Sequence, residues 1–222
     1  MIKRIISLAV TIGLIIGGLT VYKVFTKAEP QQTLESALKK TAESKSFRYS
    51  VTQQMMVDGS NKQLTQISGE KTGNDAHIKG IMYGSEVDIF HIGDTLYQKD
   101  QLAKKWMKVK GNTPAAQEIF MAELNPLSSF NFKELGEVKY LGTEKVNGQK
   151  VAVFQLNPSV QNQLMEVLWT DFSYKLYIST KTNYLVKGAL QAKSKVKPEN
   201  SLTMTVDFND YGQGIDIKAP TQ

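Results

Sequence analysis

The sequence predicts an α+β domain built on one large antiparallel sheet and preceded by a membrane-spanning segment. An uncharged run covers residues 5–22, segments of alternating polarity recur about ten or eleven times, and only about three later segments have helical spacing. The connections between successive alternating segments are mostly too short for crossover helices, which favours antiparallel neighbours. A sheet of this size with about three helices has to curve to cover its apolar face.

The composition excludes several classes of site. Hydrophobic residues make up 41% and charged residues 22% of 222 residues, which is typical of a globular chain. Cysteine is absent, which excludes disulfides, thiolate metal sites, a cysteine nucleophile and a lipid-modified N-terminal cysteine. The only histidines are His77 and His91, too few for a multi-histidine metal centre. We therefore expect no metal and no cofactor.

The positive charge is concentrated at the N-terminus. The net charge is +6, and Lys3, Arg4, Lys23 and Lys27 supply four of the positive charges. Only two of the 27 basic residues are arginines, Arg4 and Arg48. Because arginine is the usual residue for forked phosphate and guanine contacts, we expect no nucleic-acid partner.

The N-terminal segment predicts a membrane anchor. Residues 5–22 carry no charge, and as a helix they would span about 27 Å, close to the hydrocarbon thickness of a bilayer. The alternative is a cleaved signal peptide, but Thr26-Lys27-Ala28 is a poor cleavage site and the apolar run is long for a signal. The basic residues Lys3 and Arg4 favour a cytoplasmic N-terminus. The remaining chain is then extracytoplasmic, on a single-pass protein of the cytoplasmic membrane.

The chain divides into the anchor or signal segment (1–27), a short linker (28–32) and one domain (33–222). Thr33 is the predicted N-cap of an amphipathic helix that carries Leu34, Ala37, Leu38 and Ala42 and ends near Ser46. A second helix is predicted over residues 115–124. A third begins at Asn157-Pro158-Ser159 and places Val160, Leu164, Val167 and Leu168 on one face.

Alternating polarity predicts the strands. The first half contains six of them, at residues 47–57, 64–71, 76–83, 86–92, 95–99 and 106–109. The second half contains five more, at residues 138–142, 150–156, 174–179, 184–192 and 202–208. The turn at Asn147-Gly148 is the strongest short hairpin signal in the chain.

No catalytic motif is present. The sequence lacks the G-x-S-x-G elbow, the Walker loop, G-x-G-x-x-G and H-E-x-x-H. Residues 207–212 superficially suggest a calcium loop, but no glutamate closes it. We nominate no catalytic residue, and hydrolysis remains an alternative without a site. Lysines are concentrated around Trp106. They form either a solvated strand edge or a contact for anionic headgroups.

Apolar residues gather in the predicted helices and in the segment that follows the second one. They fill an ordinary core or leave a cavity for a lipid-like ligand, because methionine and aromatic side chains make adaptable apolar linings. The residues that periodicity assigns to the lining of such a cavity are Met55, Ile89, Phe120, Leu124, Phe130, Leu164 and Leu168.

Two segments carry a family resemblance. GTEKVNGQKVAVFQL (142–156) and DYGQGIDIKAP (210–220) resemble the LolA/LppX/LprG-like superfamily of extracytoplasmic lipoprotein- and lipid-carrier domains. The resemblance covers residues 33–220. It implies an open half-barrel sheet whose concave face is covered by helices that hold acyl chains against it, and it implies no catalytic residue.

The chain departs from the carrier pattern, because it lacks a lipobox cysteine and its apolar segment is expected to remain. These features favour a membrane-anchored, non-catalytic binding module for a lipid or a lipidated protein over a shuttling carrier. The alternative is a cell-envelope sensor or interaction protein with a filled core that acts through a protein partner.

Overall fold

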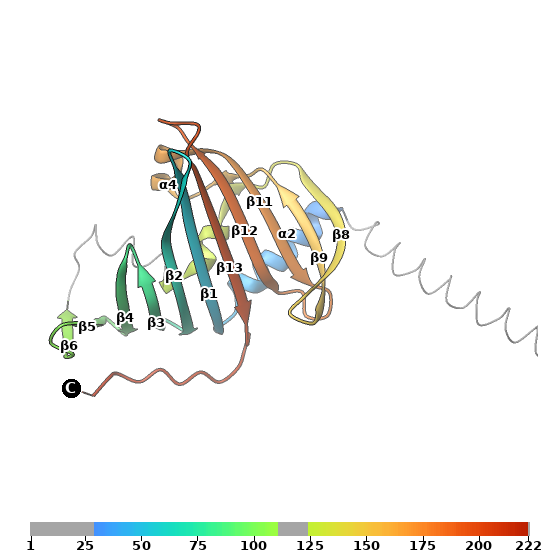
Figure 1. Cartoon of the computed structure of the whole chain (residues 1–222). Coiled ribbons are helices and arrows are strands. Elements are labelled where there is room, and N and C mark those ends of the chain that lie inside the picture. The colour runs from blue at the N-terminus through green and yellow to red at the C-terminus, as the bar shows by residue number, and fades with distance from the viewer. Residues whose placement is uncertain (1–28, 111–123, 222) are drawn as a thin grey trace, which may run out of the picture.

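The computed structural model describes residues 29–110 and 124–221, whose main feature is a curved, open sheet of eleven antiparallel strands (Figure 1). From edge to edge the order is β6-β5-β4-β3-β2-β1-β13-β12-β11-β9-β8. The strands are β1 (Ser46–Val57), β2 (Ser60–Thr72), β3 (Asp75–Met82), β4 (Ser85–Ile92), β5 (Thr95–Lys99), β6 (Trp106–Lys110), β8 (Val138–Val146), β9 (Gln149–Leu156), β11 (Trp169–Ser179), β12 (Leu185–Ser194) and β13 (Ser201–Asn209). Because β1 pairs with β13, the first and last strands meet inside the sheet.

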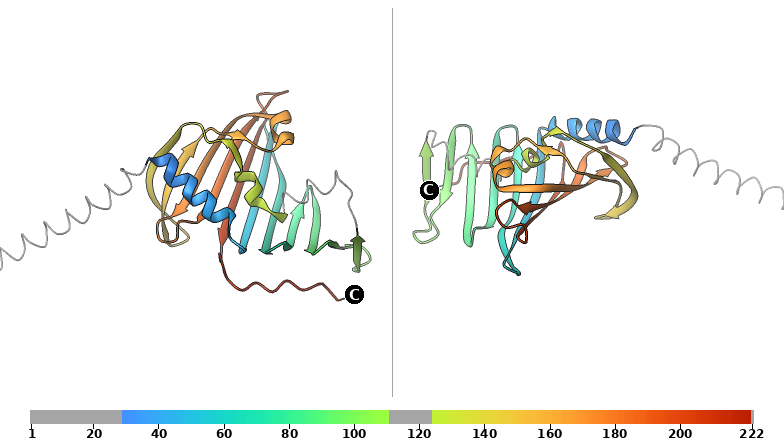
Figure 2. Two further views of the ribbon diagram at one scale, coloured as in Figure 1. Left: turned by 180° about the vertical axis from the view of Figure 1, so that it is seen from behind. Right: turned by 90° about the horizontal axis from the view of Figure 1, so that it is seen from above.

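Few other elements accompany the sheet. The described residues contain two α-helices, α2 (Pro30–Ala42) and α4 (Gln163–Leu168), and one 3-10 helix, η1 (Pro126–Phe130). Strands β7 (Phe132–Glu134) and β10 (Ser159–Val160) form a separate two-stranded sheet. Seen from behind, α2 and the η1–β7 segment lie across one face of the large sheet (Figure 2). The predicted α+β class, the large antiparallel sheet and its open form are therefore confirmed.

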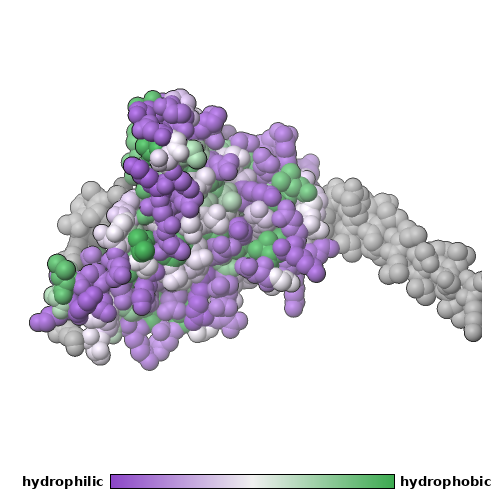
Figure 3. Space-filling view, viewed as in Figure 1, coloured by the Kyte–Doolittle hydropathy of each residue, from purple (hydrophilic) through white to green (hydrophobic). Residues whose placement is uncertain are grey.

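The two faces of the sheet differ in polarity, as the sequence alternation predicts. On β1, Phe47, Tyr49 and Val51 are buried and face the helices, whereas Arg48 and Ser50 are exposed on the other side. The outer face is largely hydrophilic (Figure 3). Burial of one face and solvation of the other fixes the register, since a one-residue slip would exchange the two sets of side chains.

Two predicted helices have different boundaries. Helix α2 begins at Pro30, with Glu29 as its N-cap, so residues 30–32 are helical and not linker. Proline suits the first helical position because its missing N–H would have no partner there. The predicted third helix begins only at Gln163, capped by Asn162, because Val160 is buried in strand β10. The predicted helix over residues 115–124 lies outside the described residues, apart from Leu124.

None of the helices in the described part of the chain is long and apolar enough to cross a bilayer. The predicted anchor, residues 5–22, lies outside that part. Anchoring and topology therefore stay predictions.

Two glycines on the concave face leave space into which aromatic rings pack. A Cβ atom at Gly188, in the middle of β12, would lie 2.2 Å from Cε1 of Phe130. The ring of Phe130 packs edge-on against Phe208 and Tyr174, at centroid distances of 5.9 and 6.2 Å. Gly69 on β2 is covered by the ring of Tyr49 in the same way. Glycine is unfavourable in a strand interior, so close approach of a ring accounts for both positions.

We predict that Gly188→Ala destabilises the fold by about 1–3 kcal/mol, because the added methyl group displaces the Phe130 ring from a packed core. Chemical denaturation measures the loss. Gly214→Ala is the control, since a Cβ atom there meets nothing within 4 Å. Equal stabilities of the two variants would contradict the close packing of the Phe130 ring against Gly188.

Candidate functional site

A cleft of about 740 Å³ opens on the concave side, between α2 and the segment formed by η1 and β7. Its apolar wall comes from α2, η1, β7 and β12, and consists of Leu38, Leu127, Phe130, Phe132, Leu135 and Leu185. Its polar members include Gln31, Glu35, Lys39, Lys133 and Glu134. We call this space the α2 cleft; it combines an apolar wall with charged groups of both signs.

The apolar wall belongs to the main core. Leu127, Phe130 and Leu185 are buried, and Leu38, Phe132 and Leu135 are half-buried against the same core cluster. Phe132 packs edge-on against Tyr174, with ring centroids 4.9 Å apart. The apolar wall is therefore continuous with the core that covers the central strands.

The charged members are exposed and partly paired. Gln31 donates a hydrogen bond of 2.9 Å to Oε1 of Glu35, one turn further along α2. Lys133 forms an ion pair with Glu166 of α4, at 2.7 Å. Exposed ion pairs contribute little to stability. These groups can therefore exchange their present partners for a polar ligand group with little loss of free energy.

One buried hydroxyl fixes helix α2 to the sheet. Thr41 donates a 2.8 Å hydrogen bond to the Ala37 carbonyl and accepts one of 3.0 Å from the backbone N–H of Leu185. The hydroxyl of Tyr211 donates a 2.7 Å hydrogen bond to the Leu185 carbonyl. Both backbone groups of the first residue of β12 are thus satisfied by side chains, and this residue lies in the α2 cleft.

Thr41→Val should lower the free energy of unfolding by about 1–3 kcal/mol, because the buried N–H of Leu185 loses its acceptor. Thr41→Ser retains the hydroxyl and should keep most of the stability. Denaturant unfolding of both variants measures the difference. A valine variant as stable as the serine variant would show that this hydrogen bond does not hold α2 in place.

Two tyrosines predict alkaline sensitivity. Burial raises the pKa of Tyr174 and of Tyr211, in the second case with a contribution from Tyr184. In the unfolded chain both phenols ionise near pH 10. The contribution of these two buried, neutral phenols to the free energy of unfolding is therefore fully present below about pH 10. It is lost as the pH rises above about 10, because the phenols then ionise more readily in the unfolded chain than in the folded protein. Urea unfolding at a series of pH values should show a steep loss of stability above about pH 10.

The variant Tyr174→Phe should make that loss less steep, because one buried phenol no longer ionises on unfolding. The control is Tyr83→Phe, at a tyrosine whose side chain is 59% exposed. An unchanged slope in Tyr174→Phe would rule out Tyr174 as a source of the alkaline sensitivity.

The structure places the predicted cavity residues in different surroundings. Phe130 lines the α2 cleft, while Leu124 and Ile89 are buried in the core and Met55 is half-buried on β1. Leu164 and Leu168 are exposed on α4, and neither lines the second cleft, of about 680 Å³, beside that helix. Phe120 lies outside the described residues. Of the six predicted cavity residues that the structure describes, only Phe130 lines the α2 cleft.

Most residues of the apolar wall were not among those predicted to line a cavity. Leu38 lies on the apolar stripe of α2, and Leu127, Phe132 and Leu135 follow the predicted second helix. The high apolar content of residues 127–135 was the available signal. It did not show that β7 would bring this segment opposite α2.

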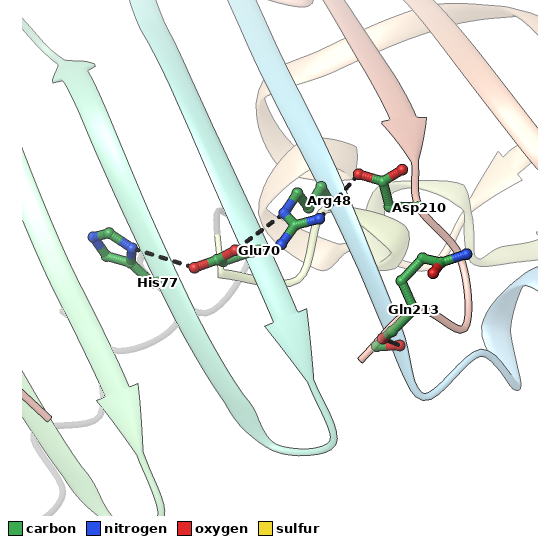
Figure 4. A network of polar contacts seen from close by, with 6 residues as sticks. Arg48, Glu70, His77, Asp210 and Gln213 are labelled. Atoms are coloured by element: carbon green, nitrogen blue, oxygen red, sulfur yellow. Dashed lines mark hydrogen bonds and ion pairs between the residues drawn. The ribbon is translucent and has the colours of Figure 1, made fainter. Parts of the chain in front are cut away.

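A row of polar side chains crosses the outer face from Asp210, which follows β13, to Asp88 on β4. Figure 4 shows the part of this row from Asp210 to His77. Arg48 on β1 contacts Asp210 at 3.0 Å and Glu70 at 3.2 Å. Nδ1 of His77 lies 3.8 Å from Oε1 of Glu70, and Nε2 of His77 lies 2.9 Å from Oδ1 of Asp88. These contacts cross-link β13 to β4 through their side chains and lie opposite the α2 cleft. The described residues contain no cluster of potential metal ligands.

Solved structures with a similar fold were found by comparison. No protein-family model and no curated protein sequence matches the chain. Lipoprotein LppX from Mycobacterium tuberculosis has a TM-score of 0.58 and 14% identity, over 85% of this chain and 98% of LppX. LprF from Mycobacterium bovis has a TM-score of 0.59 and 14% identity, over 87% of this chain and 97% of LprF. The resemblance read from the sequence is therefore confirmed at the level of the fold: this chain has a LolA/LppX/LprG-like fold.

Proposed function

We propose that the domain is an extracytoplasmic, non-catalytic binding module for a lipid or a lipidated protein, tethered to the cytoplasmic membrane by residues 5–22. The observation that carries the proposal is the α2 cleft, an amphipathic space on the concave face of a LolA/LppX/LprG-like sheet. The proposal assigns no catalytic residue and no cofactor.

The chemistry of the cleft suits an acyl chain with a polar end. Its volume of about 740 Å³ is within the range of ligand sites. Its lining combines an apolar wall with a similar number of polar and charged residues. Burial of an acyl chain against Leu38, Phe132 and Leu135 contributes about 25 cal/mol per Å² before ordering costs. The charged groups Glu35, Lys39 and Lys133 are placed to contact a headgroup.

One observation favours a second candidate function. The centre of the concave face is filled by the packed rings of Phe130, Phe208 and Tyr174. A filled centre supports an envelope sensor or interaction protein that acts through a protein partner. This candidate predicts that the domain takes up no acyl ligand and still captures a specific protein.

The lipid proposal is tested by a charge placed in the α2 cleft. Leu38→Glu should weaken binding of a fluorescent fatty-acid probe to the full chain about tenfold or more, because a carboxylate replaces a half-buried apolar contact. Titration of the purified protein in detergent-free nanodiscs measures the affinity after the probe's partition into empty nanodiscs is subtracted.

The matched control is Leu141→Glu. Leu141 is 49% exposed on the edge strand β8 and does not line the cleft, so this variant should bind the probe as the natural sequence does. Equal weakening by both variants, or no saturable binding by the natural sequence, would count against the cleft. Native mass spectrometry of the released protein then shows whether it carries an endogenous lipid.

A further inference from the structure

The hairpin of β5 and β6, residues 95–110, is unusually basic; we call it the basic hairpin. It contains five lysines and one aspartate, a net charge of +4. The whole chain beyond residue 27 has 23 basic and 21 acidic residues, a net charge of +2. The rest of that part therefore has a net charge of −2. The domain thus has a strong charge asymmetry, concentrated at one edge of the sheet.

Four lysines of the basic hairpin form no ion pair with a described carboxylate. Lys104 and Lys105 are exposed at its turn, and the ammonium groups of Lys99 and Lys108 each lie 5.6 Å from an aromatic ring centroid, that of Trp106 and of Tyr97 respectively. None of these four lysines forms an ion pair with a described residue. Elsewhere in the described chain, ion pairs engage Lys133, Lys139, Lys175, Lys187, Lys193, Lys197 and Lys218.

The turn of the basic hairpin presents an apolar tip. Leu102 is 96% exposed, and its neighbour Ala103 is also exposed. The tip is held in place, because a carboxylate oxygen of Asp100 accepts hydrogen bonds of 2.8 Å from the backbone N–H groups of both residues. The N–H of Asp100 donates a 2.9 Å hydrogen bond to the Lys105 carbonyl. The only carboxylate of the hairpin is thus used to shape the tip.

The position of the basic hairpin leaves its tip accessible. Strand β6 is the last strand of the large sheet, at the opposite edge from β8 (Figure 1). Helices α2 and α4 lie over the other part of the sheet (Figure 2). A flat surface can therefore approach this edge without a collision with the described helices.

We propose that the basic hairpin docks on an anionic lipid bilayer, with Leu102 among the headgroups and Lys99, Lys104, Lys105 and Lys108 against the negative surface. Lysines near an anionic leaflet attract it, and the rings of Trp106 and Tyr97 have the amphipathic character of interfacial residues. A soluble polyanion would attract the lysines but would offer no apolar phase for Leu102. The exposed tip therefore favours a bilayer.

A single cysteine label tests this docking, because the natural chain contains no cysteine. Ala103→Cys, labelled with an environment-sensitive fluorophore, reports from beside Leu102 in the full chain held in nanodiscs. In anionic nanodiscs the emission should shift to the blue and be quenched by spin-labelled lipids. In zwitterionic nanodiscs, or in 0.5 M salt, the shift should be lost. The same label at Thr143→Cys, exposed on β8, should show no shift.

Charge variants test the role of the lysines. In the labelled chain, Lys104→Gln with Lys105→Gln should shift the docking equilibrium about 30-fold toward the undocked state, at about 1 kcal/mol for each lysine. The matched control is Lys145→Gln with Lys150→Gln, an exposed pair on the β8–β9 hairpin at the opposite edge. Leu102→Ser should also weaken docking.

The label at residue 103 would overturn the proposal if it stayed as water-exposed in anionic nanodiscs as the label at residue 143. If soluble polyphosphate shifted the emission of the label at residue 103 to the blue as much as anionic nanodiscs do, the assignment to a bilayer would be overturned. The salt series uses the natural lysines, so it decides the electrostatic part even if a variant fails to fold. None of these readouts depends on acyl-probe binding in the α2 cleft, so docking and ligand binding can fail separately.

Discussion

An open sheet of eleven strands has one apolar face that its own strands cannot cover, and the rest of the molecule is arranged around this constraint. The segments that cover the concave face are short, and they succeed because individual side chains fit particular sites. Phe130 enters the space left by Gly188, and Leu34 and Ala37 bring α2 onto the sheet with no exposed area. The covering segments therefore pack against the sheet with little free space at these positions.

The same covering creates the α2 cleft. Helix α2 is tied to β12 through Thr41, whereas β7 is held on the other side by its pairing with β10. Two separately attached segments that share one sheet leave space where they do not meet. This geometry explains the mixed lining of the cleft. The residues next to the sheet belong to the core and form the apolar wall, and the charged residues occupy solvent-exposed positions at the opening.

The polar contacts between strands on the outer face are separated from the α2 cleft by the sheet itself. The row from Asp210 through Arg48, Glu70 and His77 to Asp88 lies on the outer face and links strands that are already hydrogen-bonded. The basic hairpin extends the sheet at its far edge, where Lys99, Lys104, Lys105 and Lys108 form no ion pair with a described residue. The cross-strand contacts, the proposed ligand site and the proposed docking surface thus lie in different regions of the domain.

The sequence by itself determined the eleven strands of the large sheet, the polarity of its two faces and the antiparallel connections, because a period of two and short turns act locally. It also identified the lysine cluster around Trp106. It did not predict β7 and β10. Tertiary structure decided what local periodicity does not carry. Val160 became part of β10 and not of a helix, because pairing with β7 buries it. Leu164 and Leu168 have helical spacing but are exposed, whereas Leu38 and Phe132 line the α2 cleft from two different elements. Spacing shows which residues share a face, and only long-range packing decides what that face contacts.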